Sequence, residues 1–386
     1  MDSELASFGR QNEWSGRGIL YLEVLGKMVS RRNLIIGGVA LVAVAGIAYA
    51  ATSGSNGGSK DKFTAAVVSD TNGVNDKGFN QSAWEGLEKW GKENGLEKGQ
   101  NGYNYFQPKT VADYNTQLTQ AATAKYDVVA AIGNTFKDSV QTVSKKYPDT
   151  KFVLVDEIAG AKYKNVASVM FRSEQSSYLV GVAAATKAKT MGDNTVGFVG
   201  GMKNPVIEAF LAGYQAGVKS VDPNIKVDAT YAGTFSDPAK GQTIAKAKIA
   251  QGEHIIFQAA GGVGNGVFQA AKDQDATLAA DSKDKVWVIG VDMDQTDMGA
   301  YKTKDGKADN LTLTSSLTGI GRGVQLVTEA AQKDKFPGGK TVYYGLKEKG
   351  VGVTTNNLNA DEKKAVEDAK AKIIAGDIKV PETPEN

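Results

Sequence analysis

Three aspartates, Asp70, Asp156 and Asp292, each follow an apolar segment that suits a buried strand. Ligands of open α/β sheets bind at the carboxyl ends of the strands, so we expect these carboxylates to face a common cleft. Carboxylates in such a cleft can bind a metal, act as an acid/base pair, or accept hydrogen bonds from hydroxyl groups. The aspartates alone leave these three kinds of site open.

The segment 65–86 joins one of these strands to a helix through a polar loop. Its apolar start predicts a buried strand, and Ala83, Leu87 and Trp90 fall on one face of the helix that follows. The loop between them carries hydrogen-bonding side chains, namely Asp70, Asn72, Asn75, Asp76 and Asn80. The loop is either a ligand site or a solvated turn whose Asn and Asp side chains cap the helix.

Two aromatic residues, Phe79 and Phe235, stand in polar, glycine-flanked loops of the two halves of the chain. Each ring either fills the core of its own domain or faces a cleft between the domains. In the second arrangement the two rings could sandwich a planar base, and stacking on a base contributes roughly 1–3 kcal/mol.

Two glycine-rich segments resemble nucleotide-binding loops only in part. Residues 261–266 follow a predicted strand and open a helix, which suits backbone N–H binding of an anion or hydroxyl. Val267 breaks the G-x-G-x-x-G pattern, so we expect no dinucleotide site. Residues 338–341 end like a phosphate loop, but Asp334 stands where its first glycine belongs. The sequence therefore predicts no nucleotide-hydrolysing site and no cofactor.

Composition excludes several kinds of chemistry. The 386 residues contain no cysteine, which rules out disulfides, thiolate metal sites and a lipid-modified cysteine. With His254 as the one histidine, we expect neither a histidine metal cluster nor a His-based triad, and we predict no catalytic or metal site. The net charge of +2 predicts no nucleic-acid-binding surface.

The N-terminal part has the features of an export segment. Arg31 and Arg32 precede an apolar run, 34–50, of 17 residues that ends in a small-x-small site at 48–50. We interpret 28–51 as a signal peptide cleaved before Ala51 or as a retained anchor, since spanning a bilayer needs about 20 residues. Residues 1–27 form a doubtful extension ahead of Met28, the alternative being a cytoplasmic tail, and 52–61 form a Gly/Ser linker.

From residue 62 onward, predicted strands alternate with predicted helices, which favours parallel sheets. The strands are predicted at 64–68, 102–106, 127–132, 152–155, 166–171, 195–199, 226–231, 254–258, 286–291, 311–315 and 341–344. This is more strands than one doubly wound sheet usually has. Residues 196–217 also loosely repeat the pattern of 67–86, an apolar strand followed by a glycine loop and a helix. We therefore predict two similar α/β domains.

The pattern D-x-x-G-V-x-D-K-x-F-N-x-S-A-W-E-G at 70–86 resembles the signature of the basic membrane protein family. These are nucleoside-binding lipoproteins that serve ABC importers. The likeness continues through NVASVMFRSEQSSYLVG, VGFVGG, YAGTFSDPAKG and VWVIGVDMDQ and covers about 63–382. It implies the type I periplasmic-binding fold, with three crossings between the domains near 171–176, 292–297 and 316–323. We accordingly expect a first domain of 62–171 and 293–320 and a second of 172–292 and 321–386.

The resemblance also implies roles for individual residues. It places the stacking rings at Phe79 and Phe235, a ribose contact at Asp292 and a contact to the base edge at Asp70, with Asp156 between the two roles. The expected ligand-binding residues are Asp70, Phe79, Asn80, Asn134, Asp156, Phe235, Gly261, Gly262, Asp292 and Thr318.

The chain departs from the family pattern at a sugar contact. Thr318 stands where the family usually has a lysine, Asn75 where an aspartate is common and Gly78 where a serine is common. These changes put the usual preference for purine nucleosides in doubt.

The sequence as a whole predicts an extracytoplasmic substrate-binding protein, not an enzyme, that closes over a nucleoside. Its expected partners are an ABC permease with a separate ATPase, and the membrane if the N-terminal segment is uncleaved; we expect a monomer. The alternatives are a binding protein for a sugar or free base, a surface adhesin, and a calcium-dependent nucleoside hydrolase. The separation of Asp70 from Asp76 by a glycine loop argues against the hydrolase.

Overall fold

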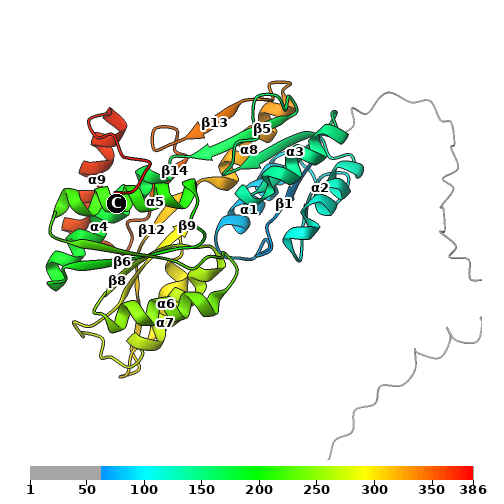
Figure 1. Ribbon diagram of the computed structural model, residues 1–386. Coiled ribbons are helices and arrows are strands. Elements are labelled where there is room, and N and C mark those ends of the chain that lie inside the picture. The colour runs from blue at the N-terminus through cyan, green and yellow to red at the C-terminus, as the bar shows by residue number, and fades with distance from the viewer. Residues whose placement is uncertain (1–61, 386) are drawn as a thin grey trace, which may run out of the picture. The chain divides into compact units, whose positions relative to one another are not determined.

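The computed structural model describes residues 62–385. They form two α/β domains, each built around a six-stranded sheet (Figure 1). This arrangement confirms the predicted fold class of two doubly wound domains. The predicted extension 1–27, the signal or anchor segment 28–51 and the linker 52–61 lie outside the described residues.

The first domain has the strand order β13-β5-β4-β3-β1-β2, with every pairing parallel. Its strands are β1 (Ala65–Val68), β2 (Tyr103–Phe106), β3 (Val128–Ile132), β4 (Lys151–Val155), β5 (Val166–Phe171) and β13 (Thr341–Tyr344). Its helices are α1 (Phe79–Glu93), α2 (Tyr114–Thr123), α3 (Lys137–Lys146) and α8 (Ile320–Gln332).

Helices cover both faces of this sheet because its central strands are apolar on both sides. Successive side chains of a strand point to opposite faces. Val67 therefore packs in one core cluster with Trp90 of α1 and Val324 of α8, while Val68 packs in another with Leu118 of α2. This two-sided burial fixes β1, and with it the loop that leaves its carboxyl end.

The second domain has the strand order β14-β12-β9-β8-β6-β7, parallel except for β14 against β12. Its strands are β6 (Thr195–Gly200), β7 (Lys226–Tyr231), β8 (Ile255–Ala259), β9 (Trp287–Asp292), β12 (Thr312–Thr318) and β14 (Val351–Val353). Its helices are α4 (Ser173–Met191), α5 (Pro205–Val221), α6 (Pro238–Ala250), α7 (Gly262–Asp275) and α9 (Ala360–Ala375). A small hairpin, β10 (Ala300–Lys302) and β11 (Ala308–Asn310), lies between β9 and β12.

The chain crosses between the two sheets three times, after β5, after β12 and after β13. Part of the predicted domain assignment is wrong. We assigned 293–320 to the first domain, but β12 pairs with β9 in the second sheet, so the chain does not cross near 292–297 as expected. We assigned 321–386 to the second domain, but α8 packs on α1 and β13 pairs with β5 in the first, and only the part from β14 onward belongs to the second. The apolar pattern of such segments suits either sheet, so the choice depends on which sheet edge is free to pair.

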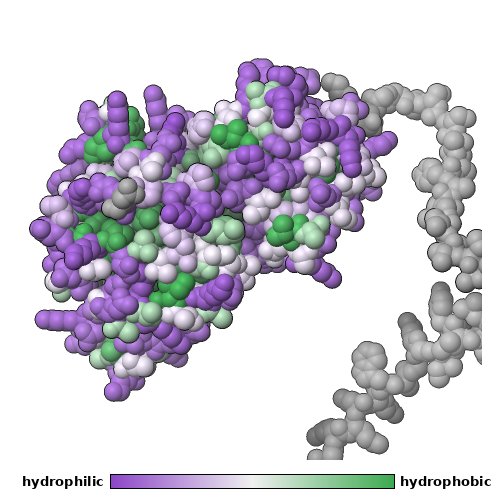
Figure 2. Space-filling model, viewed as in Figure 1, coloured by the Kyte–Doolittle hydropathy of each residue, from purple (hydrophilic) through white to green (hydrophobic). Residues whose placement is uncertain are grey.

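Figure 2 shows one face of the molecule, on which polar residues predominate and hydrophobic residues form separate patches. No helix within residues 62–385 has both the length and the apolar character needed to cross a membrane.

Candidate functional site

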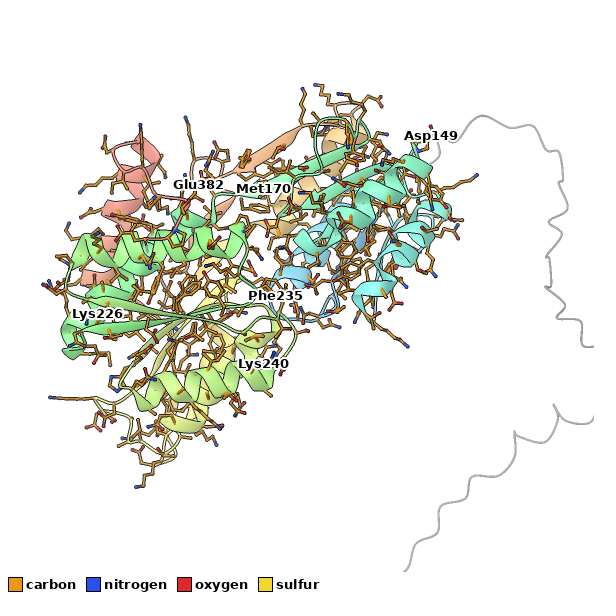
Figure 3. The ribbon with its side chains drawn as sticks, in the orientation of Figure 1. Asp149, Met170, Lys226, Phe235, Lys240 and Glu382 are labelled. Carbon is orange, nitrogen blue, oxygen red and sulfur yellow. The ribbon has the colours of Figure 1, made fainter. Side chains whose placement is uncertain are left out.

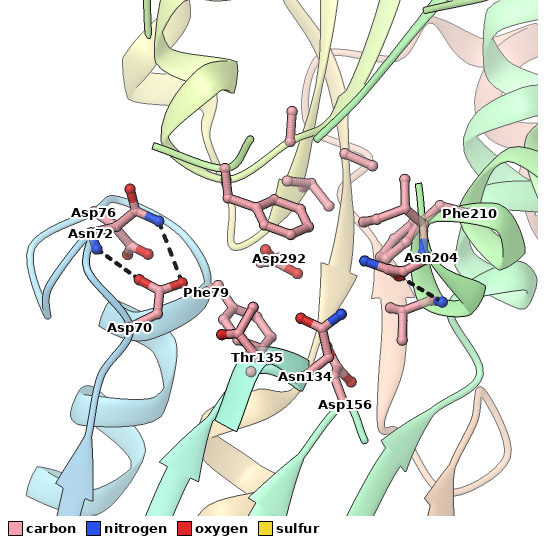
Figure 4. A pocket seen from close by; sticks show the side chains of 18 residues that line it. Asp70, Asn72, Asp76, Phe79, Asn134, Thr135, Asp156, Asn204, Phe210 and Asp292 are labelled. Carbon is pink, nitrogen blue, oxygen red and sulfur yellow. Dashed lines mark hydrogen bonds between the residues drawn. The ribbon is translucent and has the colours of Figure 1, made fainter. Parts of the chain in front are cut away.

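A cavity lies between the two domains at the carboxyl ends of their strands (Figure 4). It contains about 650 Å³ of empty space, part of it open to solvent. The first domain contributes Asp70, Asn72, Asp76, Phe79, Gly133, Asn134, Thr135 and Asp156. The second contributes Asn204, Val206, Ile207, Phe210, Phe235, Ala259, Ala260, Gly261, Val291 and Asp292.

Asp70 is fixed at the cavity wall by its own loop. Its Oδ1 accepts hydrogen bonds from the Asn72 N–H at 2.7 Å and from Asn80 Nδ2 at 2.9 Å. Burial, opposed by these hydrogen bonds, raises the pKa of Asp70 to about 6. The carboxylate is thus oriented before any ligand binds.

Asp76 and Asn80 hold the same loop onto α1. The Asp76 carboxylate accepts from the backbone N–H groups of Gly78, Asn80 and Gln81, each at 3.0 Å, so it caps the helix. Asn80 is fully buried and donates to both Asp70 and Asp76. Both interpretations of the loop therefore hold in part, because Asp76 caps the helix while Asp70 and Asp76 both line the cavity.

Asp156 and Asp292 occupy equivalent places in the two domains, at the ends of β4 and β9. Both have left-handed backbones, with φ of 60° and 66°, which is uncommon for residues other than glycine. Burial raises the pKa of Asp156 to about 7. Burial, together with the negative charge of Asp156, raises the pKa of Asp292 to about 8. None of the described residues lining the cavity is Lys, Arg or His, so no cation offsets these shifts.

The two predicted rings reach the same cavity from opposite domains. Phe79 is the first residue of α1, and a Cβ placed on Gly133 would lie 3.6 Å from its ring. Phe235 follows β7, where Figure 3 shows it on the side of the second domain that faces the first. Its ring lies on Gly201, where an added Cβ would be 2.3 Å away. Both rings also contact the core, so each is partly buried and partly exposed to the cavity.

The structure brings most of the predicted site residues together, but not all of them. Asp70, Phe79, Asn134, Asp156, Phe235, Gly261 and Asp292 line the cavity. Asn80, Gly262 and Thr318 do not. Gly262 instead lies against Asn72 of the first domain, since a Cβ on it would be 2.8 Å from Asn72 Oδ1.

Thr318 lies beside the site, next to Asp292. The two residues line a neighbouring hollow with Leu317, Gly319, Lys349, Gly350, Val351 and Gly352. Its side chain is buried, and its hydroxyl lies near enough to Asp292 to lower that carboxyl's pKa without forming a hydrogen bond of ordinary geometry. Thr318 is shorter than the lysine that the family usually has here, and a hollow lies beside it at this end of the site.

Sequence reasoning missed Asn204. Its Oδ1 accepts from the N–H groups of Val206 and Ile207 at 3.0 and 3.1 Å, so it caps α5 and its NH₂ group is left as a donor (Figure 4). The Asn-Pro pair in the loop that follows the predicted strand 195–199 was a detectable signal for a cap at the cleft edge. The apolar residues Val206, Ile207, Phe210, Ala259, Ala260 and Val291 gave no such signal, because they look like ordinary core residues.

Comparison with known sequences gives matches along nearly the whole described part. Residues 63–384 match the family model described as ABC transporter substrate-binding protein PnrA-like. The ABC transporter nucleoside-binding protein BmpA of Lactococcus lactis subsp. cremoris is 45% identical over 356 residues, covering 92% of this chain and 99% of that protein. Basic membrane protein A of Borreliella burgdorferi is 29% identical over 352 residues, covering 90% and 96%.

Comparison with solved structures gives the same fold. A solute-binding protein of an ABC transporter system from Aeropyrum pernix K1 superposes with a TM-score of 0.67 at 26% identity, covering 84% of this chain and 94% of that one. A second such protein, from Conexibacter woesei, gives 0.62 at 22% identity, covering 83% and 100%. These similarities confirm the predicted periplasmic-binding fold.

Proposed function

The chain belongs to the PnrA-like family of ABC transporter substrate-binding proteins, which includes the basic membrane proteins, and from this premise we propose that it binds a nucleoside between its two domains. The family membership makes it a substrate-binding protein that works outside the cytoplasm with an ABC transporter. The nature of the ligand is our proposal.

The observation that carries the proposal is that rings from opposite domains and several carboxylates line one cavity. Phe79 and Phe235 approach from opposite domains, which suits a flat base between them. Asp292 and Asp156 offer acceptors for the vicinal hydroxyls of a ribose, and Asp70 offers one for the base edge. A relative that shares 45% of its residues carries the name nucleoside-binding protein.

Domain closure is the mechanism we propose. A ligand that touches residues of both domains binds the closed arrangement better than the open one, and this difference in affinity shifts the population to the closed form. The closed protein then delivers the nucleoside to a permease powered by a separate ATPase. We propose that the protein acts as a monomer and that 28–51 directs it to the outer face of the membrane or beyond.

Thermal unfolding across a ligand panel tests the proposal. Nucleosides should raise the melting temperature of residues 62–386, because a ligand bound only to the folded state stabilises it by about 2.7 kcal/mol at a hundredfold excess over Kd. Sugar phosphates and amino acids are the controls and should leave it unchanged. Flat melting curves for every nucleoside would refute the proposal, and release of free base on incubation would favour the hydrolase.

A further inference from the structure

Gln295, in the loop after β9, forms a hydrogen bond between the two domains. It is only 5% exposed. Its Nε2 donates to the backbone carbonyl of Lys77 at 2.8 Å, and Lys77 belongs to the β1–α1 loop of the first domain. Gln295 is not among the residues that line the cavity, so this contact is separate from those proposed for the ligand.

The second domain fixes the orientation of the Gln295 amide. Its Oε1 accepts from Gln258 Nε2 at 2.8 Å and from the Val291 N–H at 3.0 Å, while its backbone N–H donates to Ser315 Oγ at 3.1 Å. With two donors facing Oε1, the NH₂ group must point toward Lys77. The second domain therefore holds a donor ready at the boundary between the domains.

The carbonyl that this donor meets belongs to the loop that carries Phe79. Lys77 has a left-handed backbone with φ of 58° and is followed by Gly78 and then by Phe79, the first residue of α1. Gly78 has no side chain between the loop and the second domain, and a Cβ on it would lie 3.7 Å from Gln295 Nε2. The hydrogen bond thus holds the peptide that places one of the two rings.

We propose that Gln295 is a positioning residue that holds the Phe79 loop against the second domain in the closed arrangement and thereby sets how much of the protein is closed. The proposal deepens the function proposed above and rests on it where ligand affinity is concerned. Apparent affinity scales with the populated fraction of the binding-competent state. Loss of the Gln295 hydrogen bond should therefore lower the affinity for every ligand by one common factor. Loss of a direct ligand contact would instead change the order of the ligands by affinity.

Calorimetry on three variants separates these possibilities. Gln295→Met keeps the length of the side chain and removes the donor, and Gln295→Glu keeps the acceptor for Gln258 and Val291 but places an acceptor opposite the Lys77 carbonyl. Gln258→Met is the matched control, because it removes a buried hydrogen bond of the same group, while the Val291 N–H still faces Oε1 and leaves the NH₂ group on Lys77. For both Gln295 variants we expect adenosine, guanosine, cytidine and uridine to bind about 3–10-fold more weakly, by the same factor within twofold, as befits one hydrogen bond. The control should stay within twofold of the wild type.

A distance measurement tests the same idea without a ligand. The chain has no cysteine, so Lys109→Cys and Lys240→Cys introduce a unique pair of exposed labelling sites, one on each domain. Spin labels there should show a larger population of long distances in Gln295→Met than in Gln258→Met. An unchanged distance distribution, or a loss of affinity that differs between nucleosides, would overturn the proposal. If no nucleoside binds even the wild type, the proposed function fails, and the label distances still decide whether Gln295 holds the domains together.

Discussion

The two domains share one topology, yet they offer the ligand cavity different chemistry. Their strand orders correspond, β2-β1-β3-β4-β5-β13 to β7-β6-β8-β9-β12-β14. The first domain contributes a mostly polar wall with the ring of Phe79, and the second a mostly apolar wall with the rings of Phe210 and Phe235. Repetition of the scaffold therefore does not repeat the site, because the residues at the strand ends can change without disturbing the sheets.

The carboxylates at the strand ends are equivalent at one position of the two domains and differ at another. Asp156 and Asp292 stand at equivalent strand ends with the same backbone conformation. Asp70 follows β1, whereas the equivalent strand β6 is followed by Gly201. A side chain at 201 would collide with the ring of Phe235. The position that carries the carboxylate of Asp70 in the first domain is therefore a glycine in the second, which leaves space for the Phe235 ring.

The rings also come from loops that are not equivalent, although their placement in the sequence suggests symmetry. Phe79 ends the β1–α1 connection, while Phe235 lies between β7 and α6. The short β6–α5 connection, the counterpart of the Phe79 loop, carries Asn204 instead. In the proposed complex the two domains therefore supply the same contact, a ring stacked on the base, from loops at different positions in their topology.

The largest expected effect tests whether the two rings act alike. Phe79→Ala and Phe235→Ala should each weaken nucleoside binding by about 1–3 kcal/mol, from lost stacking, as measured by calorimetry. Gly201→Ala is the matched control for Phe235, since the added methyl group displaces that ring without removing it. If either alanine variant unfolds, its ring belongs to the core, where Phe→Ala costs roughly 3–5 kcal/mol.

A smaller effect is expected from adding a cation to the second domain. Thr318→Lys should tighten ribonucleoside binding, because hydrogen bonds to charged groups contribute about 1.5–3 kcal/mol, less the cost of removing the ammonium from water. Deoxynucleosides that lack the contacted hydroxyl should gain less. Thr318→Met fills the same hollow without charge and serves as the control. An unchanged affinity for every nucleoside, with the fold intact, would mean that residue 318 does not reach the ligand.

The smallest expected effect concerns the equivalent pair Asp156 and Asp292. Their pKa values are raised from 3.8 to about 7 and about 8, so between about pH 4 and 8 the folded, ligand-free protein binds more protons here than the unfolded chain. These groups should therefore lower the melting temperature as the pH rises through that window. Asp156→Asn and Asp292→Asn should melt a few degrees higher than the wild type at pH 8.5.

The same two variants at pH 5 provide the control for this effect. Both carboxyl groups are then protonated in the wild type, so the difference in melting temperature should vanish. A difference that is equal at pH 5 and pH 8.5 would show that packing, not charge, distinguishes the variants.

Much of this protein follows from its sequence. The apolar strands buried on both faces, the alternation of strands with helices and the left-handed Gly376 that ends α9 are local features, written in hydrophobic pattern and backbone preference. The aspartates that end strands were placed in a cleft on the same local grounds. A motif match to a family then suggested which of these residues meet a ligand.

Only the tertiary structure decided which sheet β12 and β13 join, and which side chains meet across the cavity. A strand's pattern records that it is buried, not which neighbour it pairs with, so the domain boundaries after Asp292 depended on free sheet edges. The bond from Gln295 to Lys77 joins residues 218 positions apart, and Asn204 and Phe210 reach the cavity only because α5 starts beside it. Such contacts depend on the packing of whole elements, which no local spacing records.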